Sequence, residues 1–223
     1  MSGNLVALLH LCDSLFPTGS FAHSEGLEAA TANGEVQTRA DLRDWMETIL
    51  RETLRRVEGP AVARAWEAAC RFEASALAKI DNEVYALRPS SAGRESTRAM
   101  GTRLLKTWQE IRPDSSARIL RLELPVVTLP VAFGVVAAAS EVAFEPSIQG
   151  FLYSRLATAV SAAMRLMPLG QRDGHALLAE MLAHIPSVAE AIANEVGPLA
   201  AFTPLLDVTV MSQQYVQSRL FKS

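Results

Sequence analysis

Cysteines are scarce in this 223-residue sequence, and glycine-rich phosphate loops are absent from it. Its two cysteines, Cys12 and Cys70, lie far apart and outside any Cys-x-x-Cys spacing, which excludes a disulfide framework and a cysteine-based zinc site. No Gly-x-Gly occurs, and no glycine precedes Lys-Ser or Lys-Thr, so the known nucleotide-binding loops are excluded. We therefore expect reduced thiols and no nucleotide cofactor.

An excess of positive charge is also missing. Lys and Arg together number 21 against 24 for Asp and Glu, which leaves a net charge of -3 and no long-range attraction for nucleic acid. Hydrophobic residues make up 49% of the sequence and charged residues 20%, as in ordinary globular proteins. The first ten residues contain no Lys or Arg and do not resemble a signal peptide. A folded, cytoplasmic protein is expected.

One long apolar stretch, residues 124–144, raises the question of a membrane span or a strand. Two prolines together with Ser140 and Glu141 interrupt it, and no basic residues flank it, which argues against a span. Its valines favour a strand by propensity, but the prolines would remove hydrogen-bond donors and no second alternating run could pair with it. We predict a buried helix over residues 131–143 and no membrane contact.

Apolar residues recur every three or four positions along most of the chain, which predicts helices. Thr38 and Asp41 resemble a capping box, and Gly59-Pro60 is expected to end the helix that follows them and to start the next, which we extend through Leu77. Further helices are predicted over residues 38–57, 95–111, 146–167, 171–185 and 187–196.

From Gly197 onward the periodic pattern is lost, and prolines break the chain. The fold class is therefore predicted as all-α, a single-domain bundle of packed helices with a partly irregular C-terminal tail. We assign residues 1–202 to the helical domain and residues 203–223 to a partner-binding tail. The alternative for the tail is that it folds back on its own core.

Residues suited to catalysis or metal binding are few. The four histidines are never four residues apart, so no helical turn presents two of them to one metal, and we expect no metal site. His23, Ser24 and Glu25 suggest a hydrolase, but adjacent side chains point apart. The interpretation we favour is a turn at residues 16–20 followed by a helix that carries Glu28 and is capped by Ser20 or Ser24.

Three ordered motifs resemble those of the UreF family of urease accessory proteins. The first spans residues 14–28 and contains Leu15-Phe16-Pro17-Thr18-Gly19-Ser20-Phe21 and Ser24-Glu25-Gly26-Leu27-Glu28. The second is Arg165-Leu166-Met167-Pro168-Leu169-Gly170-Gln171, and the third is the chain end, Ser218-Arg219-Leu220-Phe221-Lys222-Ser223. A weaker match lies between Arg94 and Leu105. Together the motifs extend over most of the chain.

This resemblance implies a helical, non-catalytic protein without a cofactor, which forms a homodimer. It would bind a UreD/UreH-type accessory protein and recruit the GTPase UreG, so that nickel reaches apo-urease. We expect partner contacts from the tail, at Tyr215, Arg219, Leu220, Phe221 and Lys222. Interface or structural roles are expected from Pro17, Gly19, Phe21, Ser24, Arg165, Pro168, Gly170 and Gln171.

The sequence departs from the family pattern just before its end. Gln213, Gln214 and Gln217 stand where the family usually carries His, Glu and Tyr, and Tyr215 is displaced by two positions. Two alternative functions stay open. The protein could modulate GTP hydrolysis by UreG through a supplied arginine, Arg165 or Arg219, or it could be a helical hydrolase acting through His23, Ser24 and Glu25.

Overall fold

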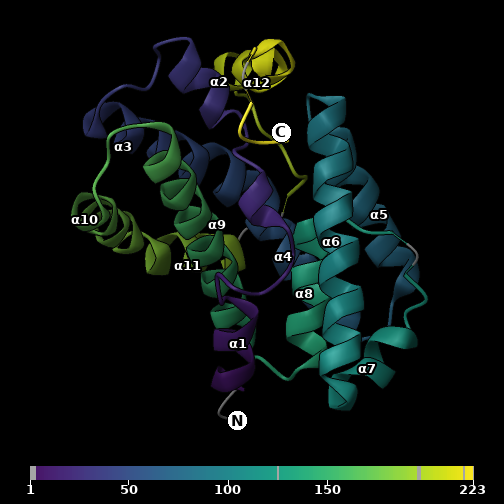
Figure 1. The fold of residues 1–223 in the computed structure, drawn as a ribbon. Coiled ribbons are helices and arrows are strands. Elements are labelled where there is room, and N and C mark those ends of the chain that lie inside the picture. Colours follow the sequence, from purple (N-terminus) through teal and green to yellow (C-terminus); the bar gives the residue numbers. More distant parts are fainter. Residues whose placement is uncertain (1–3, 125, 195–196, 218, 223) are drawn as a thin grey trace.

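Helices form all the regular structure in the computed structural model, which describes residues 4–124, 126–194, 197–217 and 219–222 (Figure 1). The all-α class is therefore confirmed. The short segments η1 and η3 are 3₁₀ turns and η2 is a π-helix. In chain order the elements are α1 (Leu5–Leu11), η1 (Ser20–Ala22), α2 (Leu27–Ala32), α3 (Arg39–Thr48), η2 (Ile49–Glu58), α4 (Gly59–Cys70), α5 (Ala74–Ala86), α6 (Ser91–Ile111), α7 (Pro113–Leu120), α8 (Leu129–Ala139), α9 (Phe144–Leu166), α10 (Gln171–Leu182), α11 (Ile185–Asn194), α12 (Pro204–Ser212) and η3 (Gln213–Tyr215).

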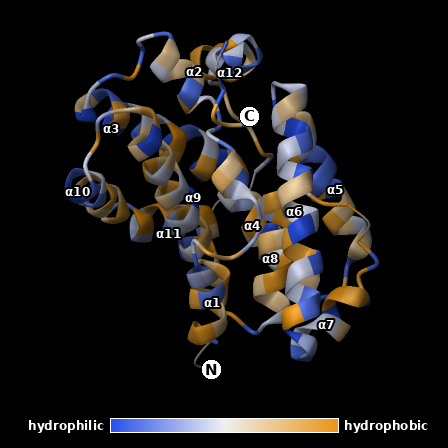
Figure 2. Cartoon of the chain, viewed as in Figure 1, coloured by the Kyte–Doolittle hydropathy of each residue, from blue (hydrophilic) through white to orange (hydrophobic). Residues whose placement is uncertain are grey.

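Helix α8 is the centre of the core. All of its residues are buried, and it packs mainly against α4 and α6. The ribbon coloured by hydropathy shows it as a largely apolar segment behind α6 (Figure 2). Gly134 lets α4 approach closely, because a Cβ at this position would lie 2.6 Å from the carbonyl oxygen of Val62. The prediction of a helix rather than a strand in this region is thus confirmed, over residues 129–139.

Helix α9 organises the other half of the molecule. It contacts α4, α10 and α11, and its N-terminal half also packs against α1. Gly174 of α10 lies against α9, with a hypothetical Cβ 3.1 Å from the sulfur of Met164, whereas Gly170 has open space around it. Of these two glycines, Gly174 alone allows α10 to approach α9 closely.

The predicted break at Gly59-Pro60 is wrong. Helix α3, η2 and α4 follow one another without interruption, and Gly59 is right-handed, with φ −62° and ψ −48°. Its N–H bonds to the carbonyl of Leu54, five residues back, so the wide π turn carries the chain past Pro60 without ending the helix. Glycine is needed here for space, since a Cβ would lie 2.7 Å from that same carbonyl oxygen.

Other boundaries also differ from the predictions. The helix expected to run through Leu77 is interrupted after Cys70, where Phe72 adopts a left-handed φ of 56°. Helices α7 and α12 were not predicted. The capping box of Thr38 and Asp41 and the helices corresponding to α6, α9, α10 and α11 are confirmed. Val196, the expected end of the last of these, lies outside the described residues, as do Pro125, Ser218 and Ser223.

By length and composition, the stretch Gln171–Asn194 is the one segment of the described chain that could cross a membrane. In the structure it consists of α10 and α11, and both of these helices pack against α9. The apolar stretch considered from sequence is instead the core helix α8.

Candidate functional site

The three sequence motifs, far apart along the chain, meet at one place, which we call the tail junction: Phe21, Glu28, Arg165, Gln213, Leu220, Phe221 and Lys222. The guanidinium carbon of Arg165 lies 3.7 Å from the ring centroid of Phe21 and 4.2 Å from that of Phe221. Its Nη2 donates to the carbonyl of Phe21 at 3.0 Å, and its Nε donates to that of Ser161 at 3.2 Å. One cation thus joins a residue from each motif.

Glu28 fixes the tail by accepting hydrogen bonds from it. Its carboxylate, 3% exposed, receives the side-chain amide of Gln213 at 2.5 Å and the backbone N–H groups of Leu220 and Phe221 at 2.5 and 3.3 Å. A further backbone bond runs from Lys222 N to the carbonyl of Ala22 at 2.8 Å. The C-terminal motif is therefore pinned to residues 22–28 by its main chain, which leaves most of its side chains available.

Gln213 is the most informative departure from the family pattern. It is buried, and its amide oxygen accepts from Ala29 N at 3.0 Å while its nitrogen donates to Glu28. Both ends of the amide are used, so glutamine serves here as a hydrogen-bonding bridge between the tail and α2. Gln214 and Gln217 are exposed.

Burial divides the predicted tail residues into two groups. Phe221 is 3% exposed and belongs to the chain's own core. The expectation that its side chain is exposed and available to a partner is therefore wrong. The alternative, a tail that folds back, holds for this ring. Leu220 and Tyr215 are 69% and 78% exposed, and Arg219 and Lys222 are also exposed.

Of the remaining predicted residues, only some reach the tail junction. Gly19 forms the expected turn with a left-handed φ of 83°, and the Oγ of Ser24 accepts a long bond of 3.4 Å from Glu28 N. Ser20 instead pairs with the hydroxyl of Thr18. Pro17 lies in the same turn, next to the buried Phe16. Pro168, Gly170 and Gln171 are exposed at the turn between α9 and α10.

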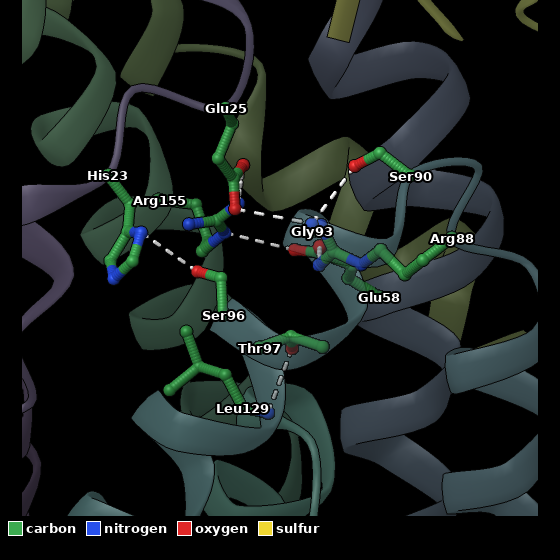
Figure 3. A network of polar contacts seen from close by, with 10 residues as sticks. All are labelled: His23, Glu25, Glu58, Arg88, Ser90, Gly93, Ser96, Thr97, Leu129 and Arg155. Carbon is green, nitrogen blue, oxygen red and sulfur yellow. Dashed lines mark hydrogen bonds and ion pairs between the residues drawn. The ribbon is translucent and has the colours of Figure 1, made fainter. Parts of the chain in front are cut away.

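Beside the tail junction lies a charge network that the sequence analysis missed: Glu25, Glu58, Arg88 and Arg155. Arg155, 8% exposed, donates from Nε to Glu58 at 3.0 Å and from Nη2 to Glu25. Arg88 pairs with both carboxylates as well, at 3.7 Å for Glu25 (Figure 3). The sequence signal for this network was Arg155 itself, an arginine between apolar residues in the middle of α9. A buried charge of this kind needs an oppositely charged partner.

The protonation states in the network follow from these contacts. Burial opposes ionisation of Glu25, but the positive charges of Arg155 and Arg88 outweigh it and hold its pKa below the usual range. Burial likewise opposes the charge of Arg155, and the two carboxylates overcome it and raise its pKa. Both shifts favour the charged forms of Glu25 and Arg155.

His23 borders the network and contacts α6. Its Nδ1 lies 2.9 Å from the hydroxyl of Ser96 (Figure 3). Burial lowers the pKa of His23; Glu25 raises it, while Lys222, Arg155 and Arg103 lower it further. Glu25, which a catalytic triad would need to orient the histidine, is engaged by two arginines. This geometry gives the hydrolase alternative no support.

Two cavities flank these groups. One, of about 380 Å³, lies between η2, the α5–α6 connection, α12 and the tail, with Glu25 and Glu58 among its lining residues. The other, of about 650 Å³, lies between α1, the turn at residues 13–21 and α9. Among the residues that the structure describes, no group of three His, Cys, Asp or Glu could hold a metal ion.

Comparison with known proteins places these features in a family. Residues 36–182 match the family model described as UreF. A "Urease accessory protein UreF" from Azoarcus sp. is 32% identical over 98% of this chain and 95% of its own length. Proteins of the same description from Actinobacillus pleuropneumoniae serotype 3 and Methylibium petroleiphilum are 29% and 32% identical and cover 99% and 100% of the chain. The end motifs lie outside the matched model but inside these full-length similarities.

Replacing Arg155 with Met is expected to lower the free energy of unfolding by about 3–5 kcal/mol, because the partly buried Glu25 and the buried Glu58 would then share a single cation. Urea denaturation measures this. The control is Arg39→Met, whose pair with Glu180 is nearly half exposed and is worth about 0–1 kcal/mol. Equal losses for the two variants would contradict the importance of the network.

Acidification is expected to destabilise the protein in two steps. The unfolded chain protonates His23 before the folded chain does, so stability falls as pH drops below about 6.5. Glu25, with its lowered pKa, adds stability that is lost as pH falls below the ordinary value of 4.5 and through the folded-state pKa. Melting temperatures measured from pH 7.5 to 3 test this, and His23→Gln should flatten the upper step. An unchanged slope in that variant would refute the assignment.

Proposed function

The chain belongs to the UreF family of urease accessory proteins, and we propose that it is a non-catalytic scaffold for nickel insertion into urease. In this proposal it works in the cytoplasm, docks a UreD/UreH-type accessory protein and recruits the GTPase UreG to apo-urease. The observation that carries the proposal is that the tail buries the ring of Phe221 in the core while apolar side chains near it remain exposed to solvent.

The displayed side chains lie on α12, on the tail and at the residue that precedes them, and we call them the tail surface: Phe202, Leu205, Val208, Met211, Tyr215 and Leu220. Their exposed fractions run from 46% for Met211 to 82% for Phe202. Exposed apolar groups of this size gathered on one short segment are typical of protein-binding sites. Glu28 accepts hydrogen bonds from the main chain of Leu220 and Phe221, and Arg165 packs on the ring of Phe221. These contacts order the segment that carries Leu220 in the absence of a partner, which lowers the entropic cost of binding.

A second apolar surface supports the proposed homodimer. Leu5, Val6 and Leu9 of α1 are each more than 60% exposed, and Leu15 of the adjoining turn is exposed too. These residues lie at the opposite end of the chain from the tail surface, and α1 lies away from α12 in space (Figure 1). We assign α1 and Leu15 to contact with a second copy, so that partner binding and dimerisation use different faces.

The double substitution Leu205→Asp with Val208→Asp is expected to weaken binding of the UreD/UreH-type protein at least tenfold, because covering each side chain is worth about 1.5–3 kcal/mol. Co-purification and titration calorimetry measure the loss, and nickel content and urease activity in cells should fall with it.

The matched control is Leu5→Asp with Leu9→Asp on α1, which should abolish the dimer in light-scattering measurements and leave affinity for the UreD/UreH-type protein intact. Removal of the chain from Met211 onward should also abolish partner binding. Unchanged nickel loading of urease in a strain that lacks the whole protein would refute the scaffold role.

A second candidate function, stimulation of GTP hydrolysis by UreG, is favoured by the exposure of Arg219. Arg165 is unsuited to it, because two rings and two carbonyls already engage its guanidinium. If Arg219 supplies the charge, Arg219→Ala should reduce stimulated hydrolysis at least tenfold in a phosphate-release assay, with exposed Arg172→Ala as control. Equal rates for both variants would leave only the scaffold.

A further inference from the structure

The cavity of about 380 Å³ beside the tail has apolar walls and an opening toward solvent, and we call it the tail cavity. Its walls include Ile49 and Val57 of η2, Val84 of α5, and Leu206 and Val210 of α12. A hollow of this size, in which aliphatic side chains are mixed with polar and charged ones, accommodates a small number of side chains from another molecule.

Charges in the tail cavity are arranged unevenly. Glu25 and Glu58 are neutralised inside the network by Arg88 and Arg155. The remaining carboxylate in the lining, Asp207, accepts a hydrogen bond from the hydroxyl of Thr203 at 3.0 Å. The chain's own arginines therefore compensate Glu25 and Glu58, while a neutral hydroxyl leaves the negative charge of Asp207 in place.

The remaining cations of the lining are Arg94, Arg219 and Lys222. Within the described part of the chain, none of these three forms an ion pair with a carboxylate. Arg94 is held in place by its bond to the carbonyl of Arg88 at 2.7 Å. In a protein of net charge -3, three such cations around one hollow are a local excess of positive charge.

We infer that the tail cavity receives an acidic segment of the UreD/UreH-type partner, which inserts an apolar side chain between η2 and α12 and directs carboxylates at Arg94, Arg219 and Lys222. The inference rests on the proposed docking function and adds the chemistry of the docked segment. Complementarity of charge selects an acidic segment, because three cations outnumber Asp207 in the lining and a basic or neutral segment would leave that positive excess uncompensated.

The test places a photo-crosslinking residue at the rim of the cavity. Ala201 is exposed and lines it, so Ala201→p-benzoylphenylalanine should fold normally and, on irradiation of the purified complex, crosslink to a partner segment rich in Asp and Glu. Mass spectrometry identifies the attached peptide. The same residue introduced at exposed Ala179 on α10 is the control and should give no such crosslink.

Charge reversal provides an independent measurement. Arg94→Glu should weaken binding of the partner at least tenfold and reduce the salt dependence of the affinity, whereas Arg172→Glu, the same change on exposed α10, should not. Lys222→Glu is a second variant for the case that Arg94→Glu disturbs the fold, because only the main chain of Lys222 bonds to Ala22.

The inference is overturned if the complex forms but the crosslink maps to a neutral or basic segment or to a second copy of this chain. It is also overturned if Arg94→Glu and Lys222→Glu bind as well as Arg172→Glu does. If the unmodified protein forms no complex with the UreD/UreH-type partner, the proposed docking function fails and this inference fails with it.

Discussion

Arg155 imposes the constraint on which the functional end of the molecule depends. A guanidinium buried in an apolar helix needs carboxylates at hydrogen-bonding distance, and these come from Glu58 in the π-helical segment and from Glu25, 130 residues earlier in the chain. Satisfying Arg155 therefore fixes the N-terminal motif against α9. Glu25 adopts a left-handed φ of 52° in doing so, and Gly26 follows with 89°, which turns the chain into α2.

The position of α2 in turn decides where the C-terminal tail can go. Glu28 presents a buried carboxylate to the tail, and Ala22 presents a carbonyl, so most of the hydrogen bonds that hold the tail come from residues placed by the network. Arg165 adds its contact with the rings of Phe21 and Phe221. The tail is ordered without a partner because its main-chain N–H groups are hydrogen-bonded within the chain and the ring of Phe221 is buried. The side chains of Leu220 and Tyr215 remain exposed.

Helical periodicity was sufficient to predict α6 and α9 from sequence, because each has a long apolar face, whereas α8, buried on all sides, was distinguished from a strand by its prolines. It failed at Gly59, where a close approach to the carbonyl of Leu54 and to Ile192 calls for glycine, a requirement that local pattern cannot reveal. Motif resemblance named Phe21, Arg165 and Phe221 but not their mutual contact. The network of Glu25, Glu58, Arg88 and Arg155 was missed because its members are distant in sequence and only Arg155 stands out locally.

Helix α12 connects the two surfaces proposed for partner binding. Leu205 and Val208 are exposed on it, Leu206 and Val210 line the tail cavity, and Thr209 is buried, with its hydroxyl 3.0 Å from Glu35. A protein that covers the exposed side of such a short helix also reaches the mouth of the cavity, so apolar contact and charge recognition are parts of one docking event. Since α12 is held by α2 and by Gln213, loss of either support would remove both contacts together. In the proposed docking mode, affinity for the partner is therefore tied to the integrity of the buried network around Arg155.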